Sequence, residues 1–343
     1  VTIANCVIAG NINKRDNDWQ ADSDETRGGG VYCDGGTLVN CYVLDNTLGD
    51  DTDNTGYGAG VYMYRGTSYN CVIAQNHGYA DHSDGAGIFI ENAIFFNNTI
   101  VANQSHGSSR GTGGICIWNS GGSATLTAYN CISVGNIGMT GGNLGDKDVA
   151  VNGGEITCYN SIVGTVRSQS DHGGSGGAYR SVQYNNCIAA TTSIFAGASA
   201  GNYRIAGNGA GSIAINRGEN EPVIGGETYY LMDYTDMDFT ARIKDCTIDA
   251  GAYEFEQTTA TPSYDYDTGS YVYYVTQNGA GNASGSSPDN AACATKLQIV
   301  LNAAGELVRT TGQNATVRLG VPQGTGFTFT ANTLSNANDP QSY

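Results

Sequence analysis

Acidic, aromatic and histidine side chains gather in four variable segments within the first 111 residues. A carboxylate accepts hydrogen bonds from sugar hydroxyls, and an aromatic ring stacks on the C–H face of a sugar, so this combination favours a glycan-binding edge. The residues expected to contact a glycan or an ion are Trp19, Asp50, Asp51, Asp53, Tyr57, Tyr79, Asp81 and Asp84. His77, His82 and His106 lie in the same segments. A solvated acidic edge that keeps the protein soluble has the same composition, and that alternative stays open.

Calcium is the one cofactor that these segments leave open. Asp50, Asp51 and Asp53 place hard carboxylate oxygens close together, as calcium requires. They lack the glycine and the distal glutamate of an EF-hand loop. No other cofactor is expected, and none of the ten cysteines shows the C-x-x-C spacing of a zinc site.

Charge and composition exclude several classes of partner. Fifteen lysines and arginines face 32 aspartates and glutamates in 343 residues, so the formal net charge is −17. Such a chain offers no basic face to nucleic acid. No apolar run approaches the ~18–20 residues of a membrane-spanning helix, so no transmembrane segment is expected. None of the five prolines precedes Pro222, which suits strands that are paired on both sides.

A repeat organises the first two thirds of the chain. One phrase reads NCVIAGN at 5–11, NCYVLDN at 40–46, NCVIAQN at 70–76, NNTIVAN at 97–103 and NCISVGN at 130–136, with weaker copies from 160 and 186. A second phrase precedes several copies, as GGVYC at 29–33, AGVYM at 59–63, AGIFI at 86–90 and GGICI at 113–117. Short strands in units of about 30 residues, without helical periodicity, predict an all-β right-handed parallel β-helix, in which each unit is one coil.

Alternation along the strands predicts the core of this solenoid. The cysteine column and the column two residues later should face inward together: Cys6, Cys41, Cys71, Cys131 and Cys187, with Ile8, Val43, Ile73 and Ile100. Neighbouring coils lie ~4.7–4.9 Å apart, whereas a disulfide prefers Cβ atoms ~3.5–4.5 Å apart, so free buried thiols are favoured over disulfides. The asparagines on both sides of the phrase should form ladders at the bends.

Residues 212–256 follow a different pattern, with AINRG at 214–218, TDMDFTAR at 235–242 and TIDAGAYEF at 247–255. This ending resembles the closing segment of bacterial right-handed β-helix surface proteins, including choice-of-anchor proteins. The coil repeat also resembles polymorphic outer-membrane proteins and polysaccharide lyases. The resemblance covers about residues 1–256 and implies that 212–256 finishes the β-helix. One departure is Phe239-Thr240-Ala241, where the family usually has a glycine turn.

The last part of the chain is expected to be a small region of strands with one amphipathic helix. Residues 257–270 are expected to be a polar linker, and the helix is expected over about 290–304. Residues 271–343 resemble the opening of a second β-helix or a cap-like module. The alternative is that this region covers the open end of another copy, which would build a head-to-tail filament.

The sequence favours a non-catalytic, extracellular protein of the bacterial cell surface. Such an adhesin-like scaffold would display its loops to glycans or to other surface proteins, and it could assemble into fibres. The alternative is a polysaccharide-active β-helix enzyme, either a lyase or a glycoside hydrolase. A β-helix lyase needs an outward lysine or arginine as its base, and the repeated phrases supply none, with Arg180 as the nearest candidate.

Overall fold

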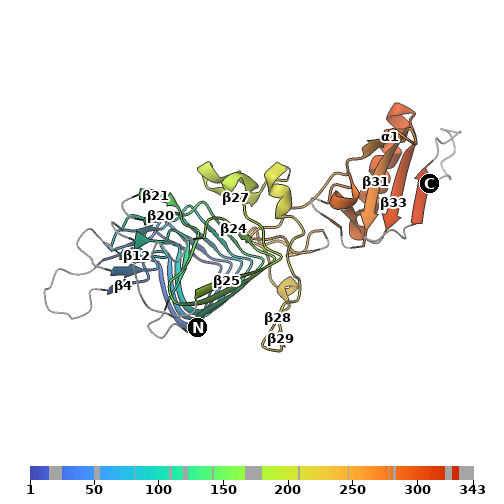
Figure 1. Ribbon diagram of the computed structural model, residues 1–343. Helices are drawn as coiled ribbons and strands as arrows, with labels where there is room; N and C mark the ends of the chain where they lie inside the picture. Colours follow the sequence, from blue (N-terminus) through green and yellow to red (C-terminus); the bar gives the residue numbers. More distant parts are fainter. Residues whose placement is uncertain are drawn as a thin grey trace, which may run out of the picture.

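The computed structural model describes residues 1–14, 25–49, 55–80, 82–107, 110–118, 123–140, 143–166, 180–207, 209–245, 247–277, 279–280, 283–320 and 327–331. The chain folds as a parallel β-solenoid, followed by a closing segment along its side and a small module with one helix (Figure 1). The predicted fold class is therefore confirmed as a mostly β, parallel solenoid.

Three sheets form the walls of the solenoid, and its coils outline a three-sided cross-section (Figure 1). Sheet A contains β1 (Thr2–Ala4), β5 (Val31–Val39), β9 (Val61–Tyr69), β13 (Ile88–Phe96), β17 (Ile115–Ile117), β18 (Ala124–Tyr129), β22 (Val149–Val151), β23 (Gly154–Tyr159) and β25 (Arg180–Asn185). Sheet B contains β2 (Val7–Ala9), β6 (Tyr42–Leu44), β10 (Val72–Ala74), β14 (Thr99–Val101), β19 (Ile132–Val134) and β24 (Ile162–Val163).

Sheet C forms the third wall, and its strands flank the variable segments in the sequence. It contains β3 (Ile12–Asn13), β4 (Glu25–Arg27), β7 (Thr47–Leu48), β8 (Thr55–Tyr57), β11 (His77–Gly78), β12 (His82–Asp84), β15 (Gln104–Ser105), β16 (Arg110–Gly111), β20 (Ile137–Thr140) and β21 (Asn143–Asp146). Strands of successive coils pair in parallel throughout sheets A and B. In sheet C, the hairpin of β20 and β21 is antiparallel, as is the pairing of β16 with β20.

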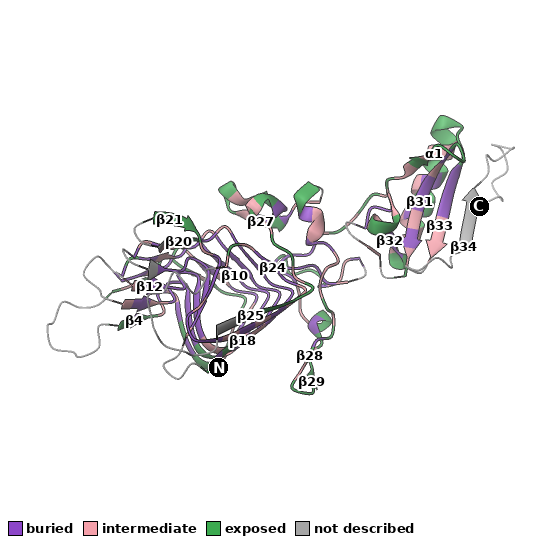
Figure 2. Ribbon diagram, viewed as in Figure 1, coloured by how far each residue is buried: buried purple, intermediate pink, exposed green. Residues whose placement is uncertain are grey.

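The register of sheet B reproduces the predicted inward column. Ile8 pairs with Val43, Val43 with Ile73, and Ile73 with Ile100. Val43, Ile73 and Ile100 are fully buried, and Ile8 packs against the same core at its edge. The interior is therefore a ladder of aliphatic side chains, and buried residues line the inner faces of the walls (Figure 2).

The cysteine column lies in this core, except at its first position. Cys41, Cys71 and Cys131 are buried free thiols, and Cys187 is half-buried. Burial raises the pKa of the Cys131 thiol to about 12, which makes it an apolar, unreactive side chain. Cys6 is exposed, contrary to its assignment to the core, because only one neighbouring coil packs against the first coil. Cys246 lies outside the described residues, and Cys293 is disulfide-bonded.

Asparagines build the bends on both sides of sheet B. Before each strand, Asn40, Asn70, Asn97 and Asn130 adopt left-handed backbone conformations with φ between 48° and 56°, which asparagine tolerates better than most residues. After each strand, buried asparagines form a ladder. The backbone N–H and the side-chain amide of Asn76 both donate to Oδ1 of Asn103, at 3.0 and 2.8 Å. Each coil is therefore hydrogen-bonded to the next one through a buried side chain.

The closing segment does not stack as a further coil. It runs along the side of the solenoid and bonds to the left-handed asparagines of several coils. Its apolar residues Ile215, Met237 and Ala250 pack on the outer face of sheet B, where Val101 and Ile132 point outward. Residues 212–256 are expected to finish the β-helix. They lie instead against the outer face of sheet B, which is apolar on both faces and needs a cover.

Short elements shape the closing segment and the turn before it. The hairpins pair β26 (Phe195–Gly197) with β27 (Asn202–Ile205) and β28 (Val223–Ile224) with β29 (Glu227–Thr228). The 3-10 turns are η2 (Thr192–Ile194), η3 (Ala198–Ala200), η4 (Gly209–Ile213) and η5 (Leu231–Asp233). Phe239 has a left-handed φ of 58° at the point where the resemblance places a glycine turn.

The C-terminal module is a small sheet covered by one helix. Its elements are β30 (Ser263–Asp265), β31 (Ser270–Thr276), η6 (Pro288–Asn290), β32 (Ala292–Cys293), η7 (Ala294–Lys296), α1 (Leu297–Thr311), β33 (Ala315–Gly320) and β34 (Phe327–Ala331). The helix begins later than the predicted 290–304, because 288–296 forms two 3-10 turns and a short strand first. The expected linker 257–270 contributes β30 to the sheet. Lys296 contacts Asp245 of the closing segment at 3.3 Å.

Substitution of one ladder asparagine tests how far the coils depend on this hydrogen bonding. Asn103→Ala leaves the backbone N–H of Asn76 and the carbonyl of Ile73 without their buried partner, and it also removes a bond to Asn136. We expect a loss of about 2–4 kcal/mol in the free energy of unfolding, measured in urea. Gln104→Ala, the neighbouring and partly exposed position, should change it by less than ~0.5 kcal/mol. Equal effects of the two variants would contradict the role of the ladder.

The left-handed backbone at Phe239 predicts a substitution that raises the free energy of unfolding. Its side chain is 57% exposed, so little packing offsets the steric cost of a left-handed conformation. Phe239→Gly should raise the free energy of unfolding by about 0.5–1 kcal/mol, since glycine removes the clash but makes the unfolded chain more flexible. Phe239→Leu keeps the Cβ atom and should show no such gain in the same urea titration.

Candidate functional site

The structure describes three of the eight residues expected to contact a ligand. Tyr57, Tyr79 and Asp84 are described, whereas Trp19, Asp50, Asp51, Asp53 and Asp81 lie outside the described residues. The calcium hypothesis, which rests on Asp50, Asp51 and Asp53, therefore stays a prediction. Among the described residues, no group of three or more histidine, cysteine, aspartate or glutamate side chains could hold a metal ion.

Tyr57 and Asp84 contribute to packing rather than to an open surface. They are register partners at the ends of β8 and β12. The Tyr57 ring lies 4.5 Å from that of Phe89 and 6.2 Å from that of Trp118, and burial raises the pKa of its hydroxyl. Asp84 is only 8% exposed and accepts a hydrogen bond of 3.2 Å from Nδ2 of Asn152. The loop assignment placed these residues on the surface, whereas pairing between neighbouring coils buries Asp84 and leaves Tyr57 half-buried.

Tyr79 lies on the outer side of sheet C in a stack with two histidines. Its ring is parallel to that of His106, with centroids 4.3 Å apart and an angle of 3° between the planes. Nδ1 of His77 lies 3.1 Å from Nε2 of His106, so one of these nitrogens donates a hydrogen bond to the other. The Tyr79 side chain remains 37% exposed. Of the three described ligand candidates, it is therefore the most exposed.

Register explains why these three residues meet. His77 pairs with Gln104 across β11 and β15, so that Tyr79 and His106 come to equivalent positions just after these strands. Partial burial and the neighbouring His77 both lower the pKa of His106. The stack presents a partly exposed aromatic surface, which suits an apolar ring face or the C–H face of a sugar.

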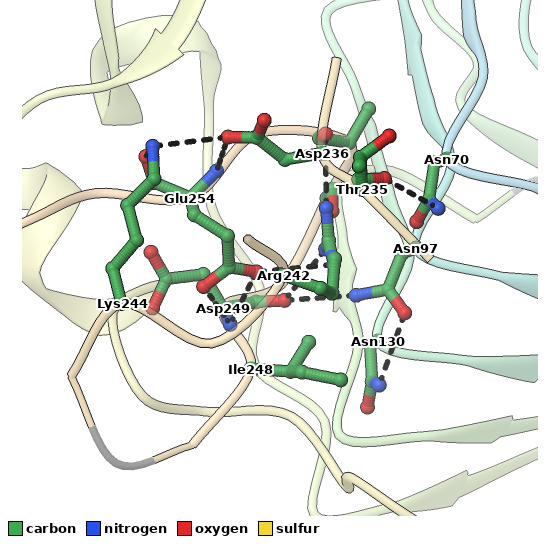
Figure 3. Close-up of polar contacts among 12 residues, drawn as sticks. Asn70, Asn97, Asn130, Thr235, Asp236, Arg242, Lys244, Ile248, Asp249 and Glu254 are labelled. Carbon is green, nitrogen blue, oxygen red and sulfur yellow. Dashed lines mark hydrogen bonds and ion pairs between the residues drawn. The ribbon is translucent and has the colours of Figure 1, made fainter. Parts of the chain in front are cut away.

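A second group of ionisable side chains lies inside the closing segment (Figure 3). Nε of Arg242 is 3.1 Å from Oε1 of Glu254, and both side chains are almost completely buried. Arg242 also donates to the carbonyls of Ala252, Gly251 and Asp249. Burial raises the pKa of Asp249 to about 7 and also raises the pKa of Glu254.

This group holds the closing segment against the solenoid. The carbonyl of Asp249 accepts a hydrogen bond of 3.0 Å from Asn97, and the N–H of Gly251 donates to the carbonyl of Asn130 at 2.7 Å. The Lys244 ammonium lies 3.1 Å from Oδ2 of Asp236, and these side chains are 15% and 0% exposed. Perturbed pKa values often mark catalytic sites, but a polymer has no access to groups as enclosed as these. Sequence analysis did not single out these charges, although Arg242 and Glu254 belong to the closing pattern.

Comparison with known proteins adds no support for the resemblance noted above, which rests on the fold alone. The chain matches no protein-family model, and it has no significant match among curated proteins or solved structures. Among the described residues, no helix is long and apolar enough to span a membrane. What the structure supports is the β-helix repeat itself.

The buried carboxyl of Asp249 should make stability depend on pH. In the folded protein, the Asp249 carboxyl keeps its proton up to about pH 7. In the unfolded chain, the same carboxyl loses it near pH ~4. The free energy of unfolding should therefore fall between about pH 4 and 7, by up to roughly 4 kcal/mol from this group. Urea titrations at several pH values measure this slope.

Two variants separate the contribution of Asp249 from that of other carboxyls. Asp249→Asn should be less stable at pH 5, because an amide cannot accept both backbone N–H groups that the carboxyl binds, and it should flatten the slope. Asp289→Asn, at an exposed position, should keep the wild-type slope. A wild-type protein that gains stability between pH 5 and 7 would contradict the assignment.

Proposed function

We propose that the protein is a non-catalytic, extracellular β-solenoid scaffold of the bacterial cell surface, which presents the outer side of sheet C to glycans or to other surface proteins. The observation that carries this proposal is the distribution of exposure. The convergent charged groups of the closing segment are buried, whereas an aromatic stack on sheet C is partly open to solvent. A rigid wall with an open aromatic surface suits binding rather than acid–base chemistry.

Three further features support a scaffold outside the cell. Buried asparagine ladders and the closing segment tie successive coils together, which gives a stiff particle. Cys293 is disulfide-bonded, and disulfides persist mainly in oxidising compartments. The net charge of −17 keeps such a surface soluble. Head-to-tail association of copies into fibres is part of the same proposal.

The alternative function is that of a polysaccharide lyase or glycoside hydrolase. The observation in its favour is Arg65, an outward and exposed side chain on sheet A, beside Asp34. Its hydrogen bond to Asp34 raises the pKa of Arg65, so the guanidinium stays protonated and is a poor base. Arg180 begins β25, and its side chain lies outside the described part of the chain. The binding function is therefore the better supported one.

Binding and turnover can be measured on the same protein. We expect immobilised glycans on an array to retain the protein, while polygalacturonate and neutral polysaccharides incubated with it release no reducing ends and no unsaturated products. Product formation that scales with protein concentration and disappears in Arg65→Ala would establish the enzyme instead. Light scattering at high concentration reads out association, and a monodisperse monomer would count against fibres.

A further inference from the structure

The stack on sheet C leaves part of the Tyr79 ring open to an external ligand. His106 covers one face of the Tyr79 ring at 4.3 Å, yet the side chain stays 37% exposed. His77 stacks on the same ring more loosely, with centroids 6.2 Å apart. A flat apolar surface of this kind is where the C–H face of a pyranose ring packs.

The ring is held in place before any ligand arrives. The backbone N–H of Tyr79 donates to the carbonyl of Leu48 at 2.8 Å, and that of His106 donates to Gly78 at 2.7 Å. The N–H of His77 is bonded in the same way to Asn46, at 2.8 Å. Contacts within the stack then restrict the ring itself. A ligand that stacks here does not need to order the loop first, so more of its contact energy remains as affinity.

Polar atoms for sugar hydroxyls lie in the same stack. The bond between His77 and His106 uses Nδ1 of the first ring and Nε2 of the second. The other nitrogen of each imidazole can then donate to or accept from a hydroxyl group. An aromatic ring beside hydrogen-bonding nitrogens is a combination that suits a sugar.

Charge selects among sugars. The chain carries a net charge of −17, which repels uronates, sialylated chains and sulfated chains. The stack contains no lysine or arginine, so it provides no permanent cation to offset that repulsion. A neutral hexopyranose carries no charge and therefore avoids this repulsion.

We propose that Tyr79, His77 and His106 form a subsite for one neutral hexopyranose residue of a glycan, whose C–H face packs on the Tyr79 ring. This inference rests on the proposed binding function and names the place and the ligand class. A protein partner would need a wider apolar surface than this stack, and Ile137 and Leu144, the exposed apolar residues on the hairpin of β20 and β21, give a test of that possibility.

Saturation-transfer NMR with methyl β-D-glucopyranoside and methyl β-D-galactopyranoside suits the weak affinity of a single subsite. We expect transfer from the protein to the ring C–H protons of at least one of them, and weaker transfer to glucuronic acid. Tyr79→Phe keeps the ring and should bind within about twofold of wild type, whereas Tyr79→Ala should bind about tenfold more weakly or not detectably. Circular dichroism verifies that both variants are folded.

Two control variants and the array separate the outcomes. Tyr230→Ala removes an exposed tyrosine from the closing segment, Leu144→Ala removes an exposed apolar side chain near the stack, and neither should change binding. Wild-type glycan binding that survives in Tyr79→Ala would overturn the subsite and leave the proposed function standing. Binding lost in Leu144→Ala but kept in Tyr79→Ala would indicate a wider protein-type interface. If the wild type binds no glycan on the array and neither methyl glycoside, both the subsite and the glycan part of the function fail.

Discussion

The bends of the coils depend on asparagine, and the rest of the structure follows from where these bends lie. One set of asparagines provides the left-handed backbone before each strand of sheet B, and a second set bonds to the next coil after that strand. Asn46, Asn76 and Asn103 each donate to the asparagine of the following coil, and Asn76 and Asn103 also accept from the preceding one. A shift of one coil would therefore leave buried polar groups unpaired on both sides of it. The register is therefore shared by all coils, while the segments beyond sheet C vary in length.

The left-handed asparagines have a second use, because their side chains point away from the core. Asn40 and Asn70 donate to Thr235, and Asn97 and Asn130 donate to Asp249 and Glu219. The closing segment thus binds a row of donors that the turns already require. The closing segment also covers the outward aliphatic side chains of sheet B and the ring column of Tyr69, Phe96 and Tyr129 on sheet A.

Sequence analysis could predict what repeats, and it failed where contacts are long-range. The column of Val43, Ile73 and Ile100 followed from strand alternation, since each copy of the phrase carries the same inward position. The path of the closing segment did not follow, because Asn40 meets Thr235 across 195 residues and no local pattern encodes that contact. One signal was present: strands such as Val72–Ala74 and Thr99–Val101 are apolar at outward as well as inward positions, which predicts a cover on both sides.

The candidate site illustrates the same division. Tyr57 and Asp84 looked like loop residues in the sequence, because the short strands β8 and β12 share no common phrase. Pairing between coils nevertheless buries Asp84 and half-buries Tyr57. The stack of Tyr79 and His106 arises from the register itself, which brings equivalent positions of neighbouring coils together. A perturbed pKa therefore does not locate function here, because the buried carboxyls whose pKa is raised, Asp249 and Glu254, only hold the closing segment. Exposure decides between the two places, since a ligand can reach a ring that solvent reaches and cannot reach Arg242.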